Sequence, residues 1–142
     1  YDNGNTIIKR ISLDYYILPE LALDRITLHN TLFPETRLVV LGFGRTSDGD
    51  FQIIVQQPFI HGTSLTDDEI RIYVESLGFK LTNPRNWTYV TPSIYLSDMH
   101  DENIIKSPQG NIFVIDCDIR INTPNLKCDG VRKLSNEVEF TV

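Results

Sequence analysis

A dense group of polar side chains lies between residues 96 and 105, in the segment LSDMHDENII. Three carboxylates, one histidine and one asparagine fall between Asp98 and Asn103, directly before the apolar pair Ile104 and Ile105. A carboxylate or an imidazole can accept a proton from a substrate, and carboxylate and amide oxygens can hold a hard divalent cation. The segment is therefore a candidate catalytic loop that leads into a buried strand.

The residues after this loop predict a β-hairpin that brings another acidic group back to it. Residues 103–116, NIIKSPQGNIFVID, contain two apolar runs around the turn signal SPQG. Because the two strands are antiparallel, Asp116 is expected to return beside Asn103. Mg²⁺ favours a few hard oxygen ligands with room left for water and phosphate oxygens, so Asn103 and Asp116 are the predicted metal ligands. Asp98 would then face a substrate hydroxyl.

Upstream of this loop, the pattern predicts a strand followed by a helix. Residues 6–12, TIIKRIS, alternate as a strand that carries Lys9. Residues 18–33 predict a helix with Leu21, Leu28 and Leu32 on one apolar stripe, and Pro34 ends it.

The middle of the chain predicts a second hairpin and a second helix. Residues 37–60 form two strands around a turn at residues 47–50, SDGD. Residues 66–77 predict a helix that starts with a capping box of Thr66 and Glu69. Residues 79–95 are aromatic and interrupted by proline, which favours strand or loop. Strands grouped in hairpins with the helices set apart predict an α+β fold.

Composition limits the classes of partner. At 142 residues the chain is long enough for one domain, and its net charge of −6 comes without a block of Lys or Arg. Nucleic acid and anionic membranes are therefore not expected partners, whereas a nucleotide held by backbone amides and a metal remains possible. No apolar run approaches transmembrane length and no signal peptide is visible. Cys117 and Cys128 lack the spacing of metal ligands, so a cytoplasmic location is expected. The chain starts with Tyr1, and we expect it to be a piece of a longer polypeptide.

The polar loop resembles the catalytic loop of protein kinases, H-R-D-L-x-x-x-N. It is closer still to the D-x-H-x-x-N form of aminoglycoside kinases and other atypical kinase-like enzymes. This resemblance implies that Asp98 is the catalytic aspartate, that Asn103 binds metal and that Asp116 opens the D-F-G motif. The sequence departs from the kinase pattern where Leu96 replaces a histidine and Cys117-Asp118 replaces Phe-Gly.

Two further segments resemble the nucleotide-binding parts of kinases. TIIKR resembles the strand with the kinase lysine, which implies that Lys9 reaches the α- and β-phosphates of ATP. The helix that follows would supply the acidic partner of that lysine, either Glu20 or Asp24. FQIIVQQPFIHG resembles the fifth strand and the hinge, which implies that the backbone from Gln57 to Phe59 holds adenine.

Taken together, residues 6 to about 122 resemble the kinase-like domain of polyvalent proteins from bacterial phages and conjugative elements. The resemblance implies one minimal or truncated protein-kinase-like domain over residues 1–142. Residues 1–57 would be a small β-rich N-lobe without the glycine-rich loop, residues 58–61 the hinge, and residues 62–142 an abbreviated C-lobe. The expected function is transfer of a phosphoryl group from ATP with Mg²⁺ to an unknown protein or small-molecule acceptor.

Two other functions remain open from the sequence. The chain could be a pseudokinase or nucleotide-binding interaction module, because the motif departures and the short C-lobe suit a protein that transfers nothing. Less favoured is a metal-dependent hydrolase that uses Asp98, His100 and Asp116 around Mn²⁺ or Zn²⁺. His100 is otherwise expected to orient the loop, with Trp87 and Tyr89 packed beneath it.

Overall fold

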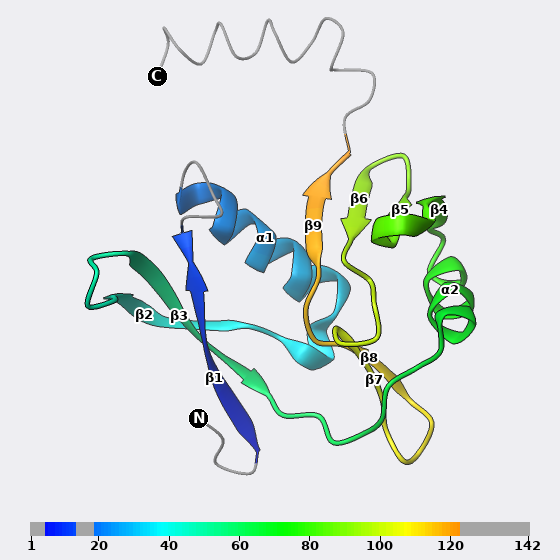
Figure 1. The fold of residues 1–142 in the computed structure, drawn as a ribbon, viewed down its shortest axis with the longest axis horizontal. Coiled ribbons are helices and arrows are strands. Elements are labelled where there is room, and N and C mark those ends of the chain that lie inside the picture. Colours follow the sequence, from blue (N-terminus) through cyan, green and yellow to red (C-terminus); the bar gives the residue numbers. More distant parts are fainter. Residues whose placement is uncertain (1–4, 14–18, 123–142) are drawn as a thin grey trace, which may run out of the picture.

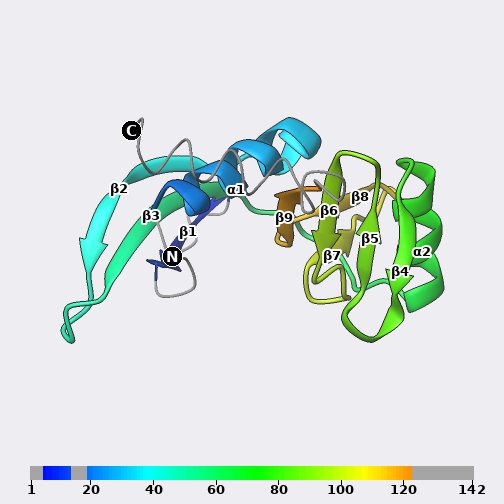
Figure 2. The same ribbon diagram turned by 90° about the horizontal axis from the view of Figure 1, so that it is seen from above.

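The computed structural model describes residues 5–13 and 19–122, which form two halves with separate hydrophobic cores (Figure 1, Figure 2). The first half holds β1–β3 and α1, and the second holds α2 and β4–β9. Cys128 and the rest of the segment after Asn122 lie outside the described residues. In chain order the elements are β1 (Thr6–Ser12), α1 (Pro19–Leu32), the 3₁₀ helix η2 (Pro34–Thr36), β2 (Val39–Arg45), β3 (Phe51–Pro58), α2 (Asp67–Ser76), β4 (Lys80–Asn83), the 3₁₀ helix η3 (Pro84–Asn86), β5 (Thr88–Val90), β6 (Ile94–Ser97), β7 (Ile104–Lys106), β8 (Ile112–Val114) and β9 (Asp118–Ile121).

The first half is built on an antiparallel sheet with the strand order β1-β3-β2. β2 and β3 form the predicted hairpin, and the pairing of β1 with β3 places Lys9 opposite Val55 and Ile7 opposite Gln57. Residues opposite each other in an antiparallel pair share one face of the sheet. Val55 and Gln57 are fully buried, so Lys9 lies on the covered face.

Helix α1 covers this face and also reaches the second core. Its buried residues Ala22 and Ile26 pack with β3, while Leu28 and Leu32 pack against the core of the second half. The predicted stripe was wrong at Leu21, which is 46 % exposed. The helix is turned so that Ala22 faces the sheet instead, because packing against the sheet selects the face that is buried.

The second half combines α2 with a four-stranded antiparallel sheet in the order β4-β5-β6-β9. The capping box of Thr66 and Glu69 is present at the start of α2, as predicted. Ile70 and Val74 of this helix are fully buried against the sheet. β9 pairs with β6, so the chain after Asp116 enters the sheet rather than continuing as a loop.

β7 and β8 form the predicted hairpin, with Ile104 opposite Val114. The connection from β3 to α2 runs along this hairpin, where Thr63 bridges to Lys106. Gly62 lies so close to the hairpin that no side chain fits there. The α+β class is confirmed, and among the described residues neither helix is long and apolar enough to cross a membrane.

Candidate functional site

The main chain of Asp98 is held on both sides. Its N–H donates to the Asn86 carbonyl at 3.4 Å, and its carbonyl accepts from Nδ2 of Asn103 at 2.7 Å. Its φ of 58° is the left-handed conformation, which Asp tolerates better than most residues. Asp98 is exposed, so a fixed backbone presents a carboxylate to solvent.

The predicted proximity of Asn103 and Asp116 is confirmed. The Asn103 carbonyl accepts from the N–H of Ile115 at 2.9 Å and from the N–H of Asp116 at 3.4 Å. Because Nδ2 of Asn103 donates to Asp98, its Oδ1 is the atom left for a cation. One amide oxygen and one carboxylate suit Mg²⁺, which usually keeps several waters, so the residues fit this ion. Their role as metal ligands stays a prediction.

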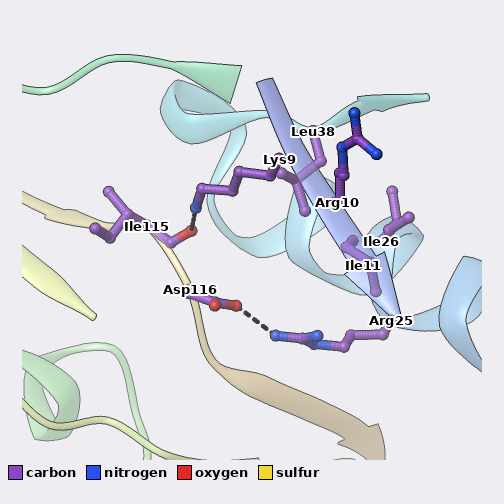
Figure 3. Close-up of a pocket in the computed structure, with 8 residues that line it drawn as sticks. All are labelled: Lys9, Arg10, Ile11, Arg25, Ile26, Leu38, Ile115 and Asp116. Atoms are coloured by element: carbon purple, nitrogen blue, oxygen red, sulfur yellow. Dashed lines mark hydrogen bonds and ion pairs between the residues drawn. The ribbon is translucent and has the colours of Figure 1, made fainter. Parts of the chain in front are cut away.

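Lys9 and Asp116 line the same small pocket, of about 90 Å³. Figure 3 shows the Lys9 side chain reaching the Ile115 carbonyl, at 3.3 Å from Nζ. Burial lowers the pKa of Lys9, and the nearby Asp116 carboxylate opposes this effect by favouring the charged amine. The two predicted nucleotide-site residues therefore share one electrostatic environment.

The partner of Asp116 is a residue that the sequence patterns missed. Arg25 of α1 forms an ion pair with Asp116 Oδ1 and donates through Nε to the Cys117 carbonyl at 2.8 Å (Figure 3). Arg25 lies between Ala22 and His29 on the buried face of the helix. A cation on a buried helix face indicates an anionic partner, and this was the sequence signal that could have identified Arg25. Oδ2 of Asp116 accepts from no group within residues 5–13 and 19–122.

Glu20 and Asp24 do not approach this pocket. Both are exposed on α1, and in the described part of the chain neither pairs with Lys9. Either residue as the acidic partner of Lys9 stays a prediction.

A family model for the serine/threonine/tyrosine kinase found in polyvalent proteins matches residues 1–123. The chain belongs to this kinase family. Comparison with curated proteins and with solved structures found no match. The matched residues include the loop, the hairpin and the pocket.

The side chain of Gln57 forms hydrogen bonds that connect the two halves of the domain. It is fully buried, and its Nε2 donates to the carbonyls of Thr36 at 2.8 Å and Ile115 at 2.9 Å. The N–H of Phe59 already donates to the Asn5 carbonyl at 2.9 Å. Adenine binding by the backbone from Gln57 to Phe59 stays a prediction, and it would have to use groups other than this N–H.

His29 adds a titratable group to the same buried region. Its Nε2 lies 3.0 Å from the Thr36 carbonyl and 3.1 Å from the Thr36 hydroxyl. Burial lowers the pKa of His29, and the hydrogen bond to the Thr36 carbonyl only partly offsets this. The neutral imidazole is therefore the form that the fold favours.

This burial predicts how stability depends on pH. Below its ordinary pKa of 6.5, His29 binds a proton in the unfolded chain while the folded form resists it, so stability is lost as the pH falls. We expect the free energy of unfolding of the parent to decrease from pH 7.5 to pH 5 more steeply than that of His29→Gln. Urea unfolding at several pH values measures this difference, and parallel curves for the two proteins would contradict it.

His100 of the polar loop has structural contacts, and the aromatic residues expected beneath the loop lie near it or in the core. His100 accepts the Glu102 N–H through Nδ1 at 3.3 Å and lies 6.2 Å from the Trp87 ring. These contacts agree with the expected orienting role, and Tyr89 is buried in the core as predicted. No group of three His, Cys, Asp or Glu side chains that could hold a metal ion occurs among the described residues. The hydrolase alternative gains no support from this arrangement.

Cys117 stands where the kinase motif has phenylalanine. It is 2 % exposed, and burial raises the pKa of its thiol far above the ordinary value. The thiol therefore stays protonated and packs in the core of the second half.

Proposed function

We propose that this member of the polyvalent-protein kinase family is an ATP- and Mg²⁺-dependent phosphotransferase. The observation that carries the proposal is the position of Asn103, which hydrogen-bonds Asp98 through its side chain and Asp116 through its backbone. One residue thus contacts the main chain of both the candidate catalytic residue and the candidate metal-binding residue. The family match supports the phosphotransferase class.

Each residue of the site has a role in this proposal. Asn103 Oδ1 and Asp116 would hold Mg²⁺, which when bound neutralises charge on the ATP phosphates. Lys9 binds a phosphate, and Asp98 orients an acceptor hydroxyl and accepts its proton. Residues 1–57 would form the N-lobe, residues 58–61 the hinge and residues 62–142 the C-lobe; in the part of the chain that the structure describes, one core lies within residues 1–57, and the other lies in the C-lobe apart from Phe33.

A thermal-shift titration with ATP, with and without Mg²⁺, tests the proposal without a known acceptor. A ligand that binds only the folded state stabilises it, by about 2.7 kcal/mol at 100 times its dissociation constant. We expect ATP to raise the melting temperature more with Mg²⁺ than without it, because Asp116 holds the metal. We expect Asp116→Ala to lose the Mg²⁺-dependent part of the shift.

Asp68→Ala is the matched control for this experiment. Asp68 also pairs with an arginine, Arg71 of α2, but it does not line the pocket. It should keep the full Mg²⁺-dependent shift. A parent protein that shows no shift with ATP and Mg²⁺ would contradict the proposed function.

The Arg25–Asp116 ion pair favours a second candidate, a nucleotide-binding module that transfers nothing. A carboxylate held by an arginine is less available to a metal, and a pocket of about 90 Å³ is small beside the roughly 300–1,000 Å³ of typical ligand sites. A thermal shift with ATP that is equal with and without Mg²⁺ would support this candidate.

A further inference from the structure

The ion pair between Arg25 and Asp116 involves the carboxylate that the proposed function assigns to Mg²⁺. Asp116 is the candidate metal ligand, yet its Oδ1 already binds a guanidinium. The Asp116 side chain is 52 % exposed, but that of Arg25 is only 22 % exposed, so the ion pair is partly shielded from solvent. The second anchor of Arg25, from Nε to the Cys117 carbonyl, fixes the guanidinium beside the carboxylate.

A divalent cation and this guanidinium cannot share Asp116 without cost. Two positive groups within a few ångströms repel each other, and the repulsion grows where burial reduces screening by water. A metal that binds Asp116 would therefore weaken the ion pair with Arg25. In the protein without a metal, Arg25 supplies the positive charge that the carboxylate needs.

The phosphates of a bound nucleotide would be a second anionic partner for Arg25. Two cations, Lys9 and Arg25, extend toward the single carboxylate of the pocket, although the whole chain carries a net charge of −6; Arg10 also lines the pocket, but Figure 3 shows its side chain pointing away from Asp116. Figure 3 shows the side chains of Lys9 and Arg25 extending from β1 and α1 toward the same segment, Ile115 and Asp116. A pocket of this charge and size suits a phosphate group rather than a nucleoside.

We propose that in the nucleotide-free protein Arg25 binds the carboxylate of Asp116, the candidate metal ligand. When a metal–nucleotide complex binds, Arg25 moves to the nucleotide phosphates. The inference rests on the proposed function, and it adds Arg25 to Lys9 as a phosphate-binding residue. The planar fork of arginine can bind a carboxylate or a phosphate with two parallel hydrogen bonds, so the same side chain suits both partners.

Arg25→Gln is the variant that tests this exchange, because it removes the charge and keeps a polar side chain. Mn²⁺ alone, followed by electron paramagnetic resonance of the free ion, probes the carboxylate. Tripolyphosphate with Mg²⁺, followed by calorimetry, probes the phosphate site without a nucleoside. We expect the variant to bind Mn²⁺ about tenfold more tightly and Mg²⁺–tripolyphosphate about tenfold more weakly, changes of about 1.4 kcal/mol in opposite directions.

Arg71→Gln is the matched control, since it also removes an arginine that pairs with an aspartate on a helix, outside the pocket. Both affinities should remain those of the parent. If Arg25→Gln does not fold, Arg25→Lys is the second variant that tests the exchange. Lysine keeps the charge but lacks the fork, so Mn²⁺ affinity should rise less and tripolyphosphate binding should be largely kept.

In Arg25→Gln, opposite shifts of the two affinities would support the exchange, and any other pattern in that variant overturns it. An unchanged or weaker affinity for Mn²⁺ in folded Arg25→Gln would show that Arg25 does not compete for Asp116. An unchanged affinity for tripolyphosphate would remove its phosphate role. If the parent binds ATP with Mg²⁺ normally, either result leaves the proposed function intact. A parent that fails to bind Mg²⁺–ATP contradicts the proposed function, while the Mn²⁺ comparison still tests the ion pair.

Discussion

Replacement of Asp98 with asparagine is expected to lower phosphoryl transfer by at least about 100-fold, the usual loss when a general base is removed. Asparagine has nearly the same shape and also tolerates the left-handed backbone conformation at φ 58°. The Asp98 carbonyl, which accepts from Asn103, is unchanged by the substitution. The variant should therefore keep its melting temperature and its affinity for Mg²⁺–ATP. Release of ADP from ATP, measured with a coupled assay, follows the transfer.

Asp101→Asn is the control for this prediction. Asp101 is an exposed carboxylate of the same loop, three residues further along the chain. Asp101→Asn should leave ADP release unchanged, because Asp101 is not expected to contact the acceptor or the metal. Full activity in Asp98→Asn would show that Asp98 is not the catalytic aspartate.

Gly62→Ala is expected to destabilise the domain by about 2–3 kcal/mol, the upper part of the usual range for overpacked sites. A Cβ on Gly62 would lie 2.3 Å from the Lys106 carbonyl oxygen and 2.5 Å from the Ile105 side chain. The hairpin backbone would have to move, and the bridge between Thr63 and Lys106 would be strained. We expect the melting temperature to fall by roughly 5–10 °C.

Gly42→Ala provides the comparison for the steric effect. A Cβ at Gly42 would meet no atom within 4 Å, so alanine fits there without displacing a neighbour. Its melting temperature should stay within a few degrees of the parent. Equal losses in the two variants would mean that the contact at Gly62 is not the cause.

The sequence predicted the local parts of this site well. The capping box of α2 and the hairpin of β7 and β8 depend on residues close together in the chain, where turn and cap chemistry decides the structure. The hairpin alone was enough to predict that Asn103 and Asp116 lie together.

The parts that the sequence did not predict depend on distant contacts. Arg25 and Asp116 are 91 residues apart, and their pairing required the rotation of α1 that placed Ala22, rather than Leu21, on the sheet. β9 is only four residues long, and it becomes a strand by pairing with β6. The motif suggested a backbone role for Gln57, whereas packing buried its side chain.

The dual packing of α1 has a consequence for cooperativity. Ala22 and Ile26 belong to the core of the first half, whereas Leu28 and Leu32 lie against the core of the second. If either half opened, the same helix would lose part of its buried surface, so each half raises the cost of unfolding the other. The two halves are thus energetically coupled through a single helix, and the domain is expected to unfold as one unit rather than half by half.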